Sequence, residues 1–498
     1  MKNIKSTLFY AIYGMSLVSL GAIIIISLLW PRDNLFSWQM ILGVFLLSVL
    51  FLLCFFVWEK LRCKFNNITS FSIALTILYG IMLYFVNCFN RNEPNSLVDY
   101  GIVWNNAWEL ARGNEIVSRE YFLTYSNNIK PMLLLGFMFR IAFLLGMEDP
   151  FYFVLIFSVL EVIAAIWSVM MLAQDNDKFG VPIIVCFGMC LPIWANTQAF
   201  YTDAMSFPFA IVIIALTKGA YKAEKRATRK VCSVVAGGLL ALGIAIKVTV
   251  CIPIIATGIA IFFVCDRSTA KRIVANLVTG GVSFICTFFF LECWVGAYEI
   301  TRLAKETSDP IIAWMALGLK GEGNFYSGQE FIYGLHTLPT KAEKVTISKE
   351  YILENKFYFW DAEHIRLKIR LNYASGHLGN TDFTYYSIGE TNILWELFAP
   401  YGRYYWRTSQ ISFCYMHALF LVCFIGNVFS IIQYKREKKF SYTLLIADLS
   451  FLGYFLFLLL WEANNRQLYN MLPMLILGTV LHANQIVVEV SERIKKLR

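Results

Sequence analysis

The chain has 498 residues, of which 58% are hydrophobic and 15% are charged. Soluble domains carry about 25% charged residues, so this composition excludes a soluble globular protein and predicts a polytopic membrane protein. The net charge of +9 does not indicate nucleic-acid binding, because most Lys and Arg residues lie in short loops and the C-terminal tail, as the positive-inside rule expects. The first apolar segment, 8–30, is too long for a signal-peptide core and is expected to be retained.

Runs of about 20 apolar residues predict the membrane-spanning helices. The chain is therefore expected to be an all-α polytopic bundle of about twelve transmembrane helices, at 8–30, 37–57, 70–89, 150–173, 180–197, 204–221, 232–247, 249–265, 273–294, 410–433, 441–461 and 468–488. The hydrophilic region 296–409 contains no such run. We accordingly divide the chain into an N-terminal helix pair, a transmembrane core, an extramembrane loop region and C-terminal helices, at 1–69, 70–295, 296–409 and 410–498.

Basic segments orient the predicted helices. Clusters of Lys and Arg mark the cytoplasmic side, and they occupy the segments 60–64, 218–230, 267–272, 435–439 and 493–498. Both termini are then cytoplasmic, and the large loop region is external. Counting crossings, the apolar stretch 131–146 cannot span the membrane, and its 16 or so residues are too few. We expect it to form an interfacial or re-entrant helix on the outer side.

The same count brings charged residues from distant parts of the chain to one membrane surface. Charged residues near a membrane core are costly and are usually functional. Six of them are predicted at the outer surface, namely Asp99, Lys130, Asp203, Lys247, Glu462 and Arg466. The spans follow from hydropathy alone, so the convergence of these charges on one side independently predicts a site there.

Asp99 lies near the start of the first external loop, in the stretch 95–113. Residues 104–110 have the pattern of a short amphipathic helix with an aromatic face. A carboxylate followed by an interfacial aromatic helix is a plausible place for chemistry on a lipid-linked substrate. The alternative is that Asp99 merely caps this helix, because Asp is a preferred N-cap residue.

Chemistry at the outer surface needs particular groups. No nucleotide-sugar pool exists outside the cell, so a transferase there would use a carrier such as a polyprenyl-phosphate sugar. Cations must stabilise the departing phosphate, and a carboxylate must take the proton of the acceptor hydroxyl. Lys130, Lys247 and Arg466 are candidate cations, and Asp99 and Asp203 are candidate bases. The two carboxylates could also share a divalent metal, although no spacing in the sequence demands one.

The order of these pieces resembles the GT-C superfamily of polyprenyl-phosphate-dependent glycosyltransferases, in the branch of the protein O-mannosyltransferases and lipid A aminoarabinose transferases. The family pattern D-x(4,5)-A-x-x-L-x-x-G is similar to Asp99, Ala107, Leu110 and Gly113, with a longer first interval. The family K-P-P-L is similar to residues 130–133, where Met132 replaces the second proline.

Three later motifs continue the resemblance, which covers roughly residues 70–490. The family Y-x-D is similar to Tyr201-Thr-Asp203, and a K-P-T is similar to Lys247-Val-Thr249 without the proline. The family E-x(3)-R-Y before a proline-containing helix is similar to Glu462 and Arg466, with Gln467 in place of the tyrosine and Pro473 after them. The external segment 309–319, which includes Trp314, is similar to a pattern in uncharacterised bacterial GT-C proteins.

The resemblance implies an inverting glycosyltransferase of a bacterial cell membrane, which moves a sugar from a polyprenyl-phosphate donor to a hydroxyl of a glycan, glycolipid or protein acceptor. Asp99 would be the base and Asp203 would position the acceptor or a metal. The donor phosphate would lie between Lys130, Lys247 and Arg466, with Tyr201, Glu462 and Trp314 in support and Glu462 orienting Arg466. Two other classes stay open. One is a transporter or flippase for lipid-linked glycans. The other is an O-antigen-type polymerase or ligase, whose key arginines would be Arg302, Arg366, Arg370 and Arg403.

Overall fold

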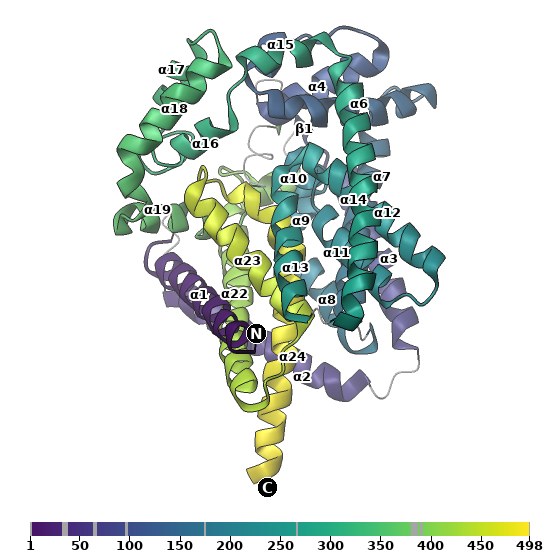
Figure 1. Cartoon of the computed structure of the whole chain (residues 1–498), viewed down its shortest axis with the longest axis vertical. Helices are drawn as coiled ribbons and strands as arrows, with labels where there is room; N and C mark the ends of the chain where they lie inside the picture. The colour runs from purple at the N-terminus through teal and green to yellow at the C-terminus, as the bar shows by residue number, and fades with distance from the viewer. Residues whose placement is uncertain are drawn as a thin grey trace.

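The computed structural model describes residues 2–31, 38–62, 67–94, 98–173, 176–264, 267–379, 387–388 and 392–497. In this part of the chain almost all regular structure is helical (Figure 1). The exception is one antiparallel pair of two-residue strands, β1 (Glu93–Pro94) and β2 (Ser387–Ile388). The predicted all-α polytopic architecture is therefore confirmed.

Ten helical stretches in the described residues are long and apolar enough to cross a membrane. Eight are single helices, namely α1 (Lys2–Leu29), α2 (Trp38–Leu61), α3 (Ile68–Phe89), α7 (Phe151–Ala173), α12 (Arg226–Ile246), α14 (Arg267–Gly296), α22 (Tyr405–Glu437) and α23 (Tyr442–Leu460). In the other two a short helical turn precedes the main helix. These are α10 (Thr202–Met205) with α11 (Phe209–Lys222), and η6 (Asn465–Met471) with α24 (Leu472–Leu497).

The other two predicted spans, 180–197 and 249–265, form shorter helices. Helix α8 (Asn176–Met189) ends before Pro192, which lies in the first turn of α9 (Leu191–Asn196). Helix α13 (Cys251–Val264) begins only after a 3-10 turn, η4 (Val248–Val250). Each of the two helices has 14 residues, so at 1.5 Å per residue it covers about 21 Å of the roughly 30 Å hydrocarbon layer.

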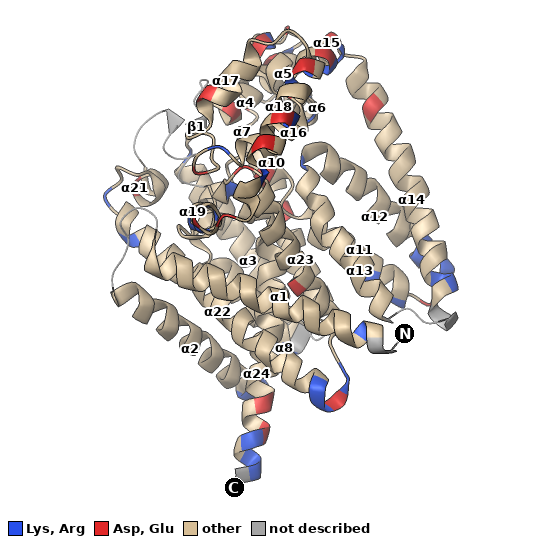
Figure 2. Ribbon diagram, turned by 60° about the vertical axis from the view of Figure 1, so that its left-hand side comes forward, with Lys and Arg blue, Asp and Glu red and all other residues tan. Residues whose placement is uncertain are grey.

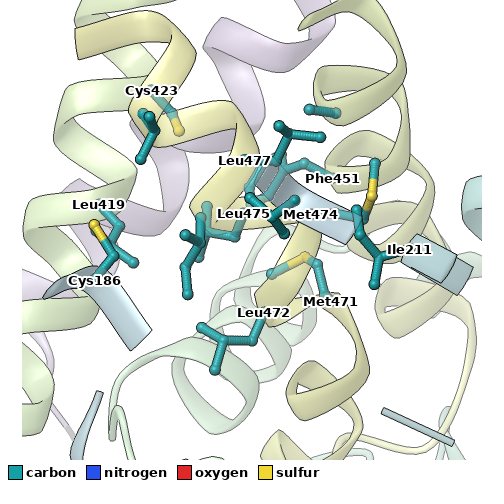
Figure 3. Close-up of a cluster of buried hydrophobic side chains, with 14 of the residues drawn as sticks. Cys186, Ile211, Leu419, Cys423, Phe451, Met471, Leu472, Met474, Leu475 and Leu477 are labelled. Atoms are coloured by element: carbon teal, nitrogen blue, oxygen red, sulfur yellow. The ribbon is translucent and has the colours of Figure 1, made fainter. Parts of the chain in front are cut away.

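The C-terminal helices form the centre of the bundle. Helix α24 packs against α22, α23, α7 and α8, and its apolar side chains meet theirs in a dry cluster (Figure 3). Leu475 and Leu477 of α24 are buried there beside Cys186 and Leu419. The predicted N-terminal pair, α1 and α2, packs against α22 from the outside. The N-terminal helix pair therefore contacts the C-terminal helices, with α1 also on α23 and α2 also on α24.

Two helices that are not among the candidate spans pack against each other at one end of the bundle. Helix α6 (Ile129–Leu144) has 16 residues, close to the predicted 131–146, and lies on α4 (Asp99–Arg112). The ring centroids of Trp104 and Phe139 are 4.7 Å apart in their interface. The aromatic face predicted at 104–110 is therefore the face of α4 that is buried against α6.

The polar cover, residues 299–373, lies over the same end of the bundle (Figure 1). It consists of α15 (Glu299–Thr307), α16 (Ile311–Leu317), α17 (Gln329–His336), α18 (Lys341–Asn355), η5 (Lys356–Phe359) and α19 (Ala362–Tyr373). Helix α21 (Ile393–Phe398) follows it and leads to α22, and another short helix, α5 (Arg119–Thr124), contacts α15. None of the candidate spans falls in the described part of 297–404.

Figure 2 shows Lys and Arg gathered at the opposite end of the bundle, where both ends of the chain lie. This distribution agrees with the basic segments used to orient the helices. Residues 63–66, 265–266 and 498, which belong to or adjoin those segments, lie outside the described residues. The bundle therefore has a basic end and an end that is closed by the polar cover.

Candidate functional site

A cavity of about 1190 Å³ lies between the bundle and the polar cover. Pockets for small ligands usually have about 300–1,000 Å³, so this one has room for a large substrate. Its walls come from segments that are far apart in sequence, including the start of α4, the ends of α12 and α14, and the loop before η6. Seven of the eight predicted site residues line it, namely Asp99, Lys130, Tyr201, Lys247, Trp314, Glu462 and Arg466.

Asp99 is the first residue of α4, and its carboxylate is not the cap of that helix. The N-cap position belongs to Val98, and no side chain caps the helix there. The Oδ1 atom of Asp99 instead accepts a hydrogen bond of 2.9 Å from the hydroxyl of Tyr121, and Oδ2 lies 3.3 Å from the hydroxyl of Tyr201. The capping interpretation is therefore wrong, and the half-buried carboxylate is aimed into the cavity. Residues 95–97 before it lie outside the described residues.

Tyr121, Asn128 and Tyr201 form a hydrogen-bonded ring with Asp99. The side-chain amide of Asn128 donates to the Tyr121 hydroxyl at 2.6 Å, and its oxygen lies 3.1 Å from the Tyr201 hydroxyl. Burial raises the pKa of both tyrosines, and the negative charge of Asp99 raises it further. Both phenols therefore stay neutral donors. Sequence reasoning missed Tyr121, which no motif marks, and Asn128, which directly precedes the 129–133 segment.

Asp203, the eighth predicted residue, does not line the cavity. It lies in the short helix α10 with only 1% of its surface exposed. Its Oδ1 pairs with the ammonium of Lys247, and its Oδ2 lies 2.9 Å from Nε of Arg466. Both carboxylate oxygens are thus occupied by cations. Asp203 is a buried counter-ion beneath the cavity wall, which corrects its predicted contact with acceptor or metal.

The arrangement gives no support to a metal shared by Asp99 and Asp203. The oxygens of Asp203 already contact Lys247 and Arg466. Within the described ranges, no group of three or more His, Cys, Asp or Glu side chains has the geometry to hold a metal ion.

The three predicted phosphate-binding cations all line the cavity, and each is close to a carboxylate. Lys247 follows the last residue of α12, and burial lowers its pKa while Asp203 opposes that change. Arg466 stacks over the ring of Tyr201, 5.0 Å from its centroid. Lys130 pairs with Glu292, which lies near the end of α14. Any anion that binds must therefore share these cations with Asp203 and Glu292.

Glu462 differs from the other acidic residues of the cavity. Glu462 and Arg466 do not lie on the same helix, because residues 461–464 connect α23 to η6 without helical structure. Among the described residues, no hydrogen-bond donor or ion-pair partner contacts its carboxylate. Burial raises the pKa of Glu462 to about 7, with Arg466 lowering it and Asp99 raising it. It is thus a carboxyl group that can change its charge near neutral pH.

The polar cover contributes Trp314 and a buried carboxylate. The ring of Trp314 lies beside that of Tyr125, with centroids 6.2 Å apart. Asp309 accepts hydrogen bonds of 2.9 Å from Lys344 and His336, and its backbone N–H donates to the carbonyl of Thr124 at 2.9 Å. The contacts with Tyr125 and Thr124 connect the cover to the end of α5 and the residue after it.

The four arginines predicted for a polymerase or ligase lie elsewhere. None of Arg302, Arg366, Arg370 and Arg403 is among the residues that line the cavity. Arg366 pairs with Glu363 on the surface of α19 and lies over the ring of Trp30. The charged groups of the cavity come instead from the loops next to the membrane spans.

A family described as conserved hypothetical integral membrane protein matches residues 2–487. The chain belongs to this family. The match covers almost the whole chain, including the N-terminal helix pair and the polar cover. No curated protein and no solved structure matched the chain. The family and the apolar helices establish an integral membrane protein that resides in a lipid bilayer.

Proposed function

We propose that this protein is a membrane glycosyltransferase that moves a sugar from a polyprenyl-phosphate carrier to an acceptor hydroxyl, with inversion at the anomeric carbon. The observation that carries the proposal is the convergence of seven residues, chosen from sequence motifs spread over positions 99–466, on one large cavity. Bilayer-spanning helices adjoin that cavity, which a substrate with a long lipid tail requires.

The cavity provides the groups that such a reaction needs. The acceptor oxygen attacks the anomeric carbon, and Asp99 takes the hydroxyl proton. The bond between that carbon and the phosphate oxygen breaks, and its electron pair stays on the phosphate. Lys247 and Arg466 stabilise the charge that develops there, and Lys130 extends the positive wall. The hydroxyls of Tyr121 and Tyr201 hold the carboxylate of Asp99 in place.

The cavity belongs to the outer face of a bacterial cell membrane in this proposal, with both termini in the cytoplasm. The gathering of Lys and Arg at the opposite end of the bundle supports that orientation (Figure 2). Glycans, glycolipids and proteins all carry hydroxyls that fit the acceptor role. The aromatic rings of Trp314, Tyr125 and Trp406 in the cavity wall are suited to contact with sugar rings.

A transporter for lipid-linked glycans is the alternative with an observation in its favour. Asp448 and His482 form a buried pair inside the bundle, 3.0 Å apart, and ionisable residues within a membrane are often part of a transport path. Neither residue lines the cavity, however, and the cavity's own charges lie at one end of the bundle. This distribution favours a reaction at one surface over passage through the bilayer.

The test is sugar transfer by purified protein in lipid nanodiscs. A panel of polyprenyl-phosphate donors carries a radiolabelled sugar, and release of the unglycosylated carrier is measured with a membrane extract as acceptor. Replacing Asp99 by Asn keeps the shape of the side chain and removes the base, so turnover should fall about 10²–10⁴-fold. The matched control is Asp149→Asn, because Asp149 pairs with Arg91 outside the cavity.

Two results would contradict the proposal. If the wild type consumes no donor of the panel, the assignment as a glycosyltransferase is wrong. If Asp99→Asn turns over as fast as the wild type, Asp99 is not the base. Binding of the donor should be similar in the wild type and in Asp99→Asn, because the cations are unchanged.

A further inference from the structure

The polar cover holds the backbone on both sides of Glu462. The N–H of Ala463 donates to the carbonyl of Gly323 at 2.6 Å. The ammonium of Lys368 donates to the carbonyls of Trp461 and Gly318. Gly318 lies so close that a Cβ there would be 2.7 Å from the oxygen of Trp461, so only glycine fits. The segment before η6 is therefore fixed, and Glu462 cannot turn away from the cavity by a small backbone shift.

The surroundings of the Glu462 carboxylate are charged on several sides. Arg466 of η6, Lys247 after α12 and Lys368 of α19 are the cations near it, and Asp99 of α4 is the nearby anion. The phenol of Tyr125, which precedes η3 (Ser126–Asn128), also faces it. Of these five groups, all except Lys368 line the same cavity.

The proposed donor would bring another negative charge to this place. Lys247 and Arg466, which would bind its phosphate, are the same cations that lower the pKa of Glu462. When a phosphate binds to these cations, they lower the pKa of Glu462 less. The phosphate also adds a second negative charge close to the Glu462 carboxylate. Both changes favour the protonated form of the carboxyl group. A protonated carboxyl group can also donate a hydrogen bond to a phosphate oxygen.

We propose that the cavity binds a phosphodiester anion together with one proton, and that Glu462 takes up this proton. The inference rests on the proposed function, because it adds a regulation of the same phosphate site. The proton comes from solvent, adds to a carboxylate oxygen of Glu462 and returns to solvent when the anion leaves. No other bond forms or breaks.

The pH dependence of binding follows from this coupling. In the free protein Glu462 has a pKa of about 7, so it is mostly protonated below neutral pH and mostly charged above it. The anion binds more tightly when Glu462 is protonated. Its affinity should therefore be constant at acid pH, where Glu462 is already protonated in the free protein. Above about pH 7 the affinity should fall about tenfold for each pH unit.

The experiment uses the full-length protein in nanodiscs and farnesyl methyl phosphodiester as the probe. This phosphodiester keeps a single fixed charge near neutral pH, so only the protein can titrate. Calorimetric titrations in buffers of different ionisation enthalpy give the affinity and the number of protons taken up. The wild type should take up close to one proton per bound probe at about pH 8, one unit above the Glu462 pKa of about 7.

Three variants identify the responsible group. Glu462→Gln is always neutral, so it should bind the probe with an affinity that does not depend on pH and without proton uptake. Glu299→Gln removes an exposed carboxylate of α15 outside the cavity, and it should behave as the wild type. Burial also lowers the pKa of Lys368 to about 7, so Lys368→Met is needed as well, and it should keep the decrease of affinity at high pH.

The outcomes separate this inference from the proposed function. If Glu462→Gln keeps the decrease of affinity at high pH, the inference is overturned, and loss of that decrease in Lys368→Met would then identify Lys368 as the titrating group. If the wild type binds the probe with no pH dependence and no proton uptake, the inference is overturned while the phosphate site stands. If the wild type does not bind the probe at any pH, both the inference and the phosphate site are overturned.

Discussion

Replacing Asp203 by Asn tests whether this residue is a buried counter-ion. Its side chain is 2% exposed, and the side chains of its partners Lys247 and Arg466 are 14% and 22% exposed. Asn has the same shape and can still accept one hydrogen bond, but it leaves two cations without a neutralising charge. Removing one member of a buried ion pair costs about 3–5 kcal/mol. Because both cations keep some contact with solvent, we expect the lower end, a loss of about 3 kcal/mol in the free energy of unfolding.

The assay is denaturant unfolding in detergent micelles, followed by tryptophan fluorescence. Asp149→Asn is the matched control, since its ion pair with Arg91 is 36% and 27% exposed and should contribute less than about 1 kcal/mol. Binding of farnesyl methyl phosphodiester should be equal or tighter in Asp203→Asn, because Lys247 and Arg466 no longer share their charge with a carboxylate. A variant as stable as the control that has lost turnover would refute the counter-ion role and restore Asp203 as a catalytic group.

Two further substitutions test the surroundings of the cavity. Tyr201→Phe removes one of the hydroxyls that contact Asp99 but keeps the buried ring, so turnover should fall about fivefold, in line with the roughly 1 kcal/mol of an average hydrogen bond, while the fold is unchanged. Steady-state rates of sugar transfer measure this, and an unchanged rate would contradict a positioning role. Asp309→Asn leaves Lys344 buried without its counter-charge, so the polar cover should be less stable and be cleaved faster by trypsin than in the wild type, and equal cleavage rates would show that this pair does not stabilise the cover.

The long spans and the helices α4 and α6 could be predicted from local patterns, although their packing against each other could not. An apolar run must satisfy all its backbone hydrogen bonds internally in a bilayer, so it forms a helix almost regardless of its neighbours. The spacing of Trp104, Ala107 and Ala111 likewise defined one face of α4 before any partner was known. The bounds of the short helices α8 and α13 were harder to predict, because they depend on a proline turn and a 3-10 turn that hydropathy does not detect.

The candidate site could likewise be predicted only in part from local sequence patterns. Motif spacing selected seven residues that line the cavity, because residue type and order along the chain survive in sequence. The hydrogen-bond and ion-pair partners of those residues could not be predicted in the same way. Tyr121 contacts Asp99 across 22 positions, and Asp203 meets Lys247 and Arg466 from separate elements. No local period relates such residues, so sequence reasoning treated Asp203 as a free acid.

The sequence by itself determined the class of protein, the long apolar spans, the amphipathic helix after Asp99 and most of the charged residues that line the cavity. These properties depend on composition and on patterns a few residues long. Only the tertiary structure decided that Asp203 is neutralised, that Asp99 is held by two phenols and that Glu462 has no partner among the described residues. Charge and hydrogen bonding act over a few ångströms in space, so they depend on which distant segments the fold brings together.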